Sequence, residues 1–400
     1  MGEDIVIVSA VRTPIGRYGG AFKEISSGHL ASIAIKEAIK RANIEAEQVD
    51  EVILGEVRQT TESSNVARVA ALRSGIPDSA PAFTVNRLCA SGMQAITSAA
   101  QQIGSGQANI VVAGGTENMS RSPIYLRSAR FGGDRTKLVD SNTEAGQQPQ
   151  EIYGENLGMG ITAENVAIRY KVSREEQDAF SVGSQRRAAK AMDEGKFKDE
   201  IVPVQVIDRK STITIEKDEY PRPDTTSEKL ANLKPAFKEN GTVTAGNACG
   251  RNDGASALVL MKASEATRLQ LKPIAKIIDW ATAGVSPEVM GIGPVPAVRK
   301  LLERTGKKVE EIGLFELNEA FASQALAVIR ELGLDENKVN VNGGAIALGH
   351  PVGSTGARIV TTLIHEMIRR QERYGIATLC VGGGQGMAIL IERFKWPLKE

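Results

Sequence analysis

Val85-Asn86-Arg87-Leu88-Cys89-Ala90-Ser91-Gly92-Met93-Gln94-Ala95 is the stretch from which the fold can first be inferred. A strand-like end at Val85 leads into a turn of small residues, and a helix pattern follows. This order predicts Cys89 at or near the N-terminus of a helix, where free backbone N–H groups and the helix dipole favour a thiolate. Cys89 is therefore a candidate nucleophile. A buried structural cysteine is the alternative.

The same succession of elements returns in the second half of the chain. The matched pairs are residues 34–52 with 297–312, 84–86 with 340–342, and 112–119 with 380–387. Three matched pairs in one order predict an internal duplication. A common α/β rhythm without true duplication is the alternative.

Short Val- and Ile-rich segments alternate with Ala-rich amphipathic helices, which predicts an α/β fold. Strands are expected at 51–55, 109–113 and 376–381. Residues 120–250 differ in composition from the two repeats. Their first part is polar, and a helix is predicted to start at the capping-box pattern Ser173-Arg174-Glu175-Glu176. We interpret this stretch as an insertion on the first repeat, and long loops on rigid scaffolds usually hold ligands.

The composition excludes several classes of protein. The chain has 400 residues, enough for two domains, and a net charge of +1 gives no reason to expect nucleic acid or an anionic membrane. Three irregularly spaced cysteines argue against a disulfide framework or a zinc site and favour a reducing cytosol. The sequence has no signal-peptide pattern and no apolar run of membrane-spanning length. We expect a cytoplasmic protein without a metal.

His350 differs from the other two histidines in its setting. It is framed by glycines and followed by a proline, which indicates a rigid turn, and it occupies the position in the second repeat that roughly corresponds to Cys89. A nucleophile that faces a base across a pseudo-twofold axis suits Cys–His catalysis. The alternative is a structural histidine that only makes hydrogen bonds within its own loop.

Two further predicted strands are followed by glycine-rich or polar residues that could contact a ligand. Cys380 precedes Gly382-Gly383-Gly384-Gln385-Gly386, where a ligand can approach backbone N–H groups closely. This run lacks the Lys-Ser/Thr of a P-loop, and too little chain follows it for a dinucleotide-binding unit. Asn318, between a strand and a helix, could orient a water or a carbonyl oxygen, and Glu319 could equally cap the helix.

These segments resemble the thiolase family. Residues 85–95, 318–322, 343–353 and 380–386 are similar to its four signature segments, and 242–247 and 290–294 match further ones, in order and across essentially the whole chain. The resemblance implies an α/β thiolase fold, with duplicated βαβαβαββ halves in a five-layered αβαβα arrangement and an inserted loop domain. The expected N-terminal half is 1–119 plus 251–271, the coenzyme A-binding insertion is 120–250, and the C-terminal half is 272–400.

The resemblance also implies an acyltransferase activity. It consists of reversible Claisen condensation of acetyl-CoA with an acyl-CoA, or thiolytic cleavage of 3-ketoacyl-CoA, through an acyl-Cys89 intermediate with ping-pong kinetics. Coenzyme A is then a substrate or product, and no permanently bound cofactor is implied. Acetyl-CoA, acyl-CoA and 3-ketoacyl-CoA are the expected partners, within fatty acid metabolism. The family implies a homodimer, or a homotetramer formed by two dimers.

Individual roles follow by the same resemblance. Cys89 resembles the acylated nucleophile, His350 the activating base and an oxyanion donor, and Cys380 the second acid/base, which moves the α-proton of acetyl-CoA. Asn318 is expected to hold a water in one oxyanion hole, and the N–H groups of Cys89 and Gly382 to form the other. Coenzyme A contacts are implied for Arg222 on the adenine, for Met290 and Phe321 along the pantetheine and acyl pocket, and for Cys249.

Two positions depart from the family pattern. Cys249 stands where the family usually has serine, and a thiol is a weaker hydrogen-bond partner than a hydroxyl. Gly158 stands where short-chain biosynthetic thiolases often carry histidine, which leaves room for longer 3-ketoacyl chains.

Three other functions can be weighed against the same residues. A decarboxylating or carrier-protein-dependent condensing enzyme tends to have histidine in place of Cys380. A non-catalytic thiolase-like lipid- or acyl-CoA-binding protein would lack Cys89 or His350, and both are present. An NAD-dependent oxidoreductase would need a ribose-binding acid after the glycine run.

Overall fold

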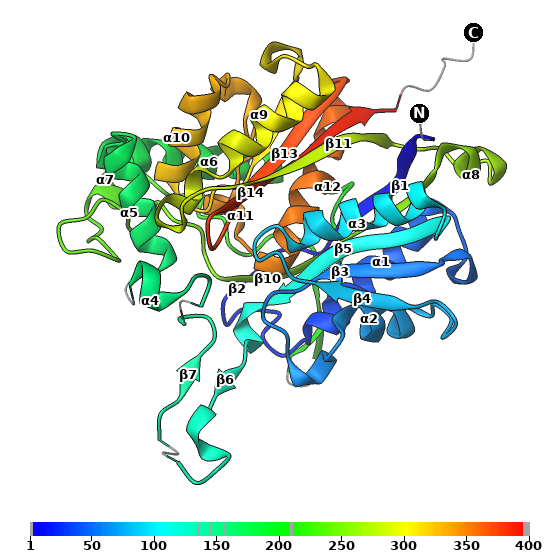
Figure 1. The fold of residues 1–400 in the computed structure, drawn as a ribbon, viewed down its shortest axis with the longest axis horizontal. Coiled ribbons are helices and arrows are strands. Elements are labelled where there is room, and N and C mark those ends of the chain that lie inside the picture. Colours follow the sequence, from blue (N-terminus) through cyan, green and yellow to red (C-terminus); the bar gives the residue numbers. More distant parts are fainter. Residues whose placement is uncertain (1–2, 134–135, 145, 155–156, 209–210, 395–400) are drawn as a thin grey trace.

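The computed structural model describes residues 3–133, 136–144, 146–154, 157–208 and 211–394, and its main sheet has ten strands in two halves (Figure 1). The first half has the order β4-β3-β5-β10-β1, the second has the order β11-β14-β13-β12, and β1 pairs with β11 where the halves meet. A short strand, β2 (Gly16–Arg17), pairs with β10. The strands are β1 (Ile5–Arg12), β3 (Glu51–Gly55), β4 (Ala82–Val85), β5 (Ile110–Asn118), β10 (Asn252–Lys262), β11 (Ala275–Gly284), β12 (Leu314–Leu317), β13 (Tyr374–Val381) and β14 (Gln385–Arg393).

Both halves of the sheet follow one pairing pattern. In the first half, β3 is parallel to β4 and β5, and β10 is antiparallel to β5 and β1. In the second half, β12 is parallel to β13, and β14 is antiparallel to β13 and β11. A parallel bridge between Phe315 and Val339 lies beside β12 as β4 lies beside β3. The predicted duplication is therefore confirmed.

The helices form three layers around the two halves of the sheet. Helices α1 (Ser27–Ala42) and α2 (Val66–Ser74) cover the outer face of the first half, and α9 (Pro294–Thr305) and α10 (Ala322–Leu332) cover that of the second. Helices α3 (Ser91–Ser105) and α12 (Val352–Arg370) lie between them (Figure 1). Strand residues alternate between these layers, as in β13, where Ile376 faces the outer helices and Ala377 the central pair. The predicted five-layered arrangement is confirmed.

Two glycines let the backbones of α3 and α12 approach closely. A Cβ atom at Gly92 would lie 2.7 Å from the backbone N of Ala357, and one at Gly356 would lie 2.4 Å from the backbone N of Met93. Close packing leaves no room for either atom unless a helix shifts. Cys89 precedes α3 and His350 precedes α12, so this helix contact also sets how far apart the two residues lie.

The segment between β5 and β10 leaves the sheet and returns to it. In the second half, a short turn at residues 382–384 makes the corresponding connection between β13 and β14. Figure 1 shows the hairpin of β6 and β7 extending away from the layers, and α5 to α7 on the side of α10. The elements of this segment are β6 (Ile124–Tyr125), β7 (Val139–Asp140), α4 (Gln150–Tyr153), α5 (Met159–Arg169), α6 (Arg174–Asp193), β8 (Val204–Asp208), β9 (Ser211–Ile215) and α7 (Ser227–Ala231). Two short helices elsewhere are α8 (Ala263–Arg268) and α11 (Ala345–Leu348).

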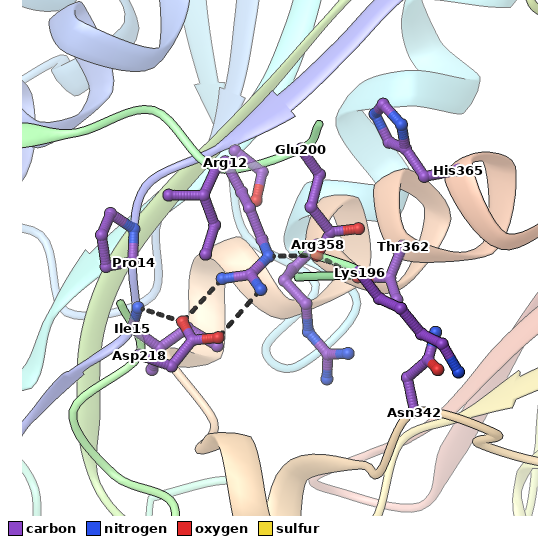
Figure 2. Close-up of polar contacts among 12 residues, drawn as sticks. Arg12, Pro14, Ile15, Lys196, Glu200, Asp218, Asn342, Arg358, Thr362 and His365 are labelled. Atoms are coloured by element: carbon purple, nitrogen blue, oxygen red, sulfur yellow. Dashed lines mark hydrogen bonds and ion pairs between the residues drawn. The ribbon is translucent and has the colours of Figure 1, made fainter. Parts of the chain in front are cut away.

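A buried arginine ties this segment to the sheet (Figure 2). Arg12 of β1 donates from Nε to Glu200 at 2.6 Å, and from Nη1 and Nη2 to the two carboxylate oxygens of Asp218 at 2.7 and 2.9 Å. Thr362 of α12 donates to the same Glu200 at 3.1 Å. None of the three charged side chains is more than 1% exposed. One clamp therefore joins β1, the inserted segment and a central helix.

Local signals explain where several elements begin. Ser26 caps α1 by accepting from the backbone N–H of His29, so the helix starts at Ser27. The capping box of Ser173 and Glu176 is present at the start of α6, as predicted. No helix in the described part of the chain is both long and apolar enough to cross a membrane.

Candidate active site

A cavity of about 420 Å³ lies where both halves and the inserted segment meet. It brings together all three cysteines of the chain and most of the residues singled out from the sequence. Those that line it are Cys89, Cys249, Met290, Phe321, His350, Cys380 and Gly382. Asn318 and Arg222 are not among the lining residues. A larger cavity of about 490 Å³ opens beside Phe197 and Asp218, away from every cysteine.

Cys89 sits in the turn between β4 and α3, as predicted. Leu88, just before it, has a left-handed φ of 46°, and its N–H is held by the side chain of Asn86 at 2.9 Å. The sulfur of Cys89 accepts a hydrogen bond from the backbone N–H of Gly382. Burial nevertheless raises the pKa of Cys89 above its ordinary value, because desolvation outweighs this donor. The backbone N–H groups of Gly382 and Cys89 itself each lower the pKa of Cys89, as predicted for this turn, but burial outweighs them. Cys89 is a thiol that needs a base.

His350 lies two residues before α12, just as Cys89 lies two residues before α3. Its backbone N–H donates to Asn252 Oδ1 at 3.0 Å, and its Nδ1 lies 2.7 Å from Thr355 Oγ1. Burial, and secondarily the positive charge of Arg358, lowers the pKa of His350 to about 3. The imidazole is therefore neutral at physiological pH and can accept a proton.

Cys380 is the penultimate residue of β13, and its side chain is fully buried. Burial, together with the nearby sulfurs of Cys89 and Cys249, raises the pKa of Cys380 well above its usual value. Gly382 begins the turn after β13, and a Cβ there would lie 3.0 Å from Cγ of Gln147. The second buried thiol and the backbone donor to Cys89 thus come from one strand end.

Asn318 lies outside the cavity wall but carries an unmet hydrogen-bonding capacity. It is 1% exposed, and neither its Oδ1 nor its Nδ2 has a partner within the described structure. Such buried amides are usually satisfied by ordered water. The finding is compatible with the predicted role of holding a water.

Glu319 does not cap the following helix, contrary to one of the two possibilities drawn from the sequence. Its carboxylate accepts from Ser184 Oγ at 2.7 Å, from Asn340 Nδ2 at 2.8 Å and from the backbone N–H of Ile346 at 3.2 Å. Gln324 instead accepts from the N–H groups at the start of α10. Glu319 therefore fixes the loop that leads to His350.

The predicted coenzyme A contacts divide into two groups. Cys249, Met290 and Phe321 line the cavity, and burial with the nearby Cys89 raises the pKa of Cys249 to about 12. Arg222 stands outside it, with its guanidinium carbon 5.5 Å from the centre of the Tyr220 ring. That ring abuts the wall at Gly250, where a Cβ would lie 2.5 Å from Tyr220 Cζ. Arg222 therefore lies next to the cavity rather than in it.

Other lining residues were missed from the sequence. Phe237 forms an edge contact with Phe321, with ring centres 6.2 Å apart, and its ring fills the space beside Gly160. Nothing in the polar segment around Phe237 marks it. Arg58 also lines the cavity, three residues after the parallel strand β3. Arg58 could have been predicted, because ligand-binding residues of α/β folds often lie just after the carboxyl end of a parallel strand.

The arrangement can perform acyl transfer. It combines a thiol nucleophile, a neutral imidazole, a second thiol, and backbone donors such as the N–H of Gly382. Among the described residues, no group of His, Cys, Asp or Glu side chains could hold a metal ion.

Comparison with known proteins gives matches over nearly the whole chain. The family model "Thiolase, N-terminal domain" matches residues 5–264, and "Thiolase, C-terminal domain" matches 271–393. An acetyl-CoA acetyltransferase of Syntrophomonas wolfei is 49% identical over 98% of this chain and 100% of its own length. The crystal structure of the Bacillus anthracis acetyl-CoA acetyltransferase has a TM-score of 0.95 at 49% identity, covering 98% of this chain and 99% of that one. Human mitochondrial 3-ketoacyl-CoA thiolase in complex with CoA has a TM-score of 0.92 at 42% identity, covering 98% of each chain.

Proposed function

Since this chain belongs to the thiolase family and is an acyltransferase, we propose that it condenses acetyl-CoA with an acyl-CoA, and cleaves 3-ketoacyl-CoA in reverse, through an acyl-Cys89 intermediate. The observation that carries this proposal is the meeting of Cys89, His350 and Cys380 in one cavity. The relatives are named as enzymes, and nothing in the comparisons supports a non-catalytic acyl-CoA-binding protein.

The first half-reaction transfers the acyl group to the enzyme. His350 takes the proton of the Cys89 thiol, and the thiolate attacks the thioester carbonyl. The carbonyl oxygen gains negative charge and is met by the N–H groups of Cys89 and Gly382. Collapse of this intermediate breaks the bond to the sulfur of coenzyme A, which leaves with the proton from His350.

The second half-reaction forms the carbon–carbon bond. The neutral His350 takes the proton of the Cys380 thiol, and the Cys380 thiolate takes the α-proton of a bound acetyl-CoA. The resulting enolate oxygen is stabilised by the N–H that His350 has gained and by a water held by Asn318. The enolate attacks the acyl-Cys89 carbonyl, the bond between the acyl carbon and Cys89 breaks, and the Cys89 sulfur takes the proton of His350 as the 3-ketoacyl-CoA is released. One carbon–carbon bond forms, the thioester bond to Cys89 breaks, and no oxidation or reduction is needed.

The remaining assignments extend this proposal. The inserted segment 120–250 binds coenzyme A and contributes Arg222 and Cys249, while Met290 and Phe321 of the C-terminal half line the pantetheine and acyl pocket. The N-terminal half is 1–119 plus 251–271, and the C-terminal half is 272–400. The protein works as a homodimer or a homotetramer in the cytoplasm, in fatty acid metabolism. The three cysteines are all unpaired thiols, which suits a reducing compartment.

Space beside Gly158 supports substrates longer than acetoacetyl-CoA. Gly158 lines the cavity, and no atom of the described residues lies within 4 Å of a Cβ built there. The segment is close to the reacting groups, because Gln147 packs on Gly382 and Gln148 donates to the carbonyl of Leu157 at 2.8 Å. An acyl chain can therefore extend from Cys89 toward this space.

Thiolysis of a series from acetoacetyl-CoA to 3-ketododecanoyl-CoA tests the activity and its chain length together. We expect the wild type to cleave the longer substrates. Gly158→Leu should lower kcat/KM for the longest by roughly tenfold or more, while sparing acetoacetyl-CoA, because the side chain fills the acyl space. Its backbone φ of −80° accepts any residue.

Gly104→Leu is the matched control, since Gly104 is exposed on α3 and also has open space around it. The same chain-length profile in wild type and Gly158→Leu would contradict the acyl-space assignment. Absence of thiolysis on every member of the series would overturn the proposed activity itself.

His350→Ala should slow alkylation of Cys89 by iodoacetamide near neutral pH by roughly 10²-fold or more, because a general base contributes about 10²–10⁴. The pKa of His350 is lowered to about 3, so the base form persists through the weakly acidic range. The wild-type rate should therefore show no inflection near the ordinary histidine pKa of about 6.5. An unchanged rate in His350→Ala would mean that His350 does not activate Cys89.

A further inference from the structure

Nδ1 of His350 has one hydrogen-bond partner among the residues that the structure describes. Nδ1 lies 2.7 Å from Oγ1 of Thr355, in the first turn of α12. Thr355 is fully buried and is not among the residues that line the cavity, whereas His350 is. Thr355 therefore touches the candidate base without access to the substrate.

The hydrogen-bond directions around Thr355 can be worked out from its second contact. Its Oγ1 lies 2.9 Å from the backbone carbonyl oxygen of Pro351, the usual bond of a helical threonine to the residue four before it. A carbonyl oxygen only accepts, and a hydroxyl has one hydrogen. Pro351 O also accepts the backbone N–H groups of Ser354 and Thr355 at 2.9 Å each, so the Thr355 hydroxyl is the third donor to this oxygen. The oxygen of Thr355 is then left to accept from His350.

The ring of His350 is thereby limited to one arrangement of its hydrogen. A neutral imidazole carries hydrogen on one nitrogen and a lone pair on the other. With Thr355 as an acceptor, the hydrogen must be on Nδ1, and Nε2 has the lone pair. Asn252 holds the backbone N–H of His350 at 3.0 Å, which restrains the rest of the residue.

We propose that Thr355 is a positioning residue, which keeps His350 in the Nδ1–H tautomer so that the Nε2 lone pair faces the cavity and takes the Cys89 proton. This rests on the proposed role of His350 as the base. The proton moves from the sulfur of Cys89 to Nε2, the imidazolium keeps its Nδ1–H bond to Thr355, and the proton then passes to the departing sulfur of coenzyme A. The opposite tautomer would present an N–H to a thiol that must lose its own hydrogen.

Nitrogen NMR of protein labelled with ¹⁵N-histidine reads the tautomer directly. The chain has only three histidines, and His365 is a built-in reference: its Nε2 lies 2.9 Å from the carbonyl oxygen of Ala10, which requires Nε2–H. We expect opposite tautomers at His350 and His365 in the wild-type protein, with His350→Gln used to assign the signals. An Nε2–H signal for His350 would overturn the proposal.

Thr355→Val and Thr355→Ser form a matched pair for the kinetic test. Valine keeps the shape of threonine and removes the hydroxyl, while serine keeps the hydroxyl. Thr355→Val should mix the tautomers of His350 and slow acylation of Cys89 by roughly 10- to 100-fold, the usual effect of losing such an outer partner, with little change in KM. Thr355→Ser should retain the wild-type tautomer and a rate close to wild type.

The outcomes separate this proposal from the proposed function. If His350→Ala slows alkylation of Cys89 but Thr355→Val, shown to be folded by its thermal transition, keeps the wild-type tautomer and rate, the role of Thr355 is refuted alone. If His350→Ala has no effect, the base assignment fails first. Should Thr355→Val not fold, the wild-type tautomer measurement still decides.

Discussion

Cys89→Ser is expected to lower thiolysis and condensation by roughly 10⁴-fold or more, the scale seen when a covalent nucleophile is removed from a catalytic set. A serine hydroxyl is a far weaker acid than a thiol, and the neutral, buried His350 is a weak base that cannot compensate. Mass spectrometry after mixing with acetyl-CoA should find an acetyl group on the Cys89 peptide of the wild type and none on the variant. Full activity in Cys89→Ser would end the assignment.

The other two cysteines provide the comparison that makes this result specific. Cys380→Ser should still acquire the acetyl group on Cys89, slowly, but should lose condensation, because it lacks the base for the α-proton. Cys249→Ser, also in the cavity wall, should still acquire the acetyl group and condense, because a hydroxyl can replace the thiol at this expected coenzyme A contact and neither step takes a proton from Cys249. Equal loss of acylation and condensation in Cys380→Ser would contradict the division of roles between the two thiols.

Arg12→Met should lower the free energy of unfolding by about 3–5 kcal/mol, the usual cost of removing one partner from a buried ion pair. The change leaves the carboxylates of Glu200 and Asp218 buried without their cation, in the setting of Figure 2. Chemical denaturation followed by circular dichroism measures the loss. Adding Asp218→Asn to Arg12→Met should restore part of it, because one uncompensated charge is then removed.

Arg373→Met is the matched control for Arg12→Met. Arg373 pairs with Glu392 at 2.8 Å, but its side chain is 59% exposed, so solvent screens the pair and its loss should change the free energy of unfolding far less. A similar loss in both variants would mean that burial does not set the strength of the Arg12 clamp.

Most of the fold could be predicted because its signals are local and occur twice. Glu51–Gly55 is a strand with the predicted bounds, and the helix before it ends at Ala42 as expected, where Asn43 takes a left-handed φ of 55°. The repeat then placed Cys89 and His350 at equivalent points before the central helices. That equivalence required no knowledge of long-range contacts.

The candidate site was less predictable where burial or distant packing decides. The helix N-terminus at Cys89 suggested a thiolate, but the cost of desolvating the charge depends on surroundings that the local sequence does not specify. Glu319 accepts a hydrogen bond from Ser184 of the inserted segment, so its role could not be read from the residues around it in the sequence. Phe237 reaches the cavity from a polar loop whose path is set by tertiary contacts. Arg222 is not among the residues that line the cavity, because tertiary contacts also set the path of its segment.

The turn at residues 382–384 and the long excursion between β5 and β10 are the same connection in two versions. The short version presents a backbone N–H to Cys89, while the long one supplies much of the surrounding wall. The turn at 382–384 thus contributes to the reacting groups, and the equivalent connection between β5 and β10 contributes to the cavity around them. Substitutions in the longer connection can therefore reshape the cavity wall without changing the backbone that faces Cys89.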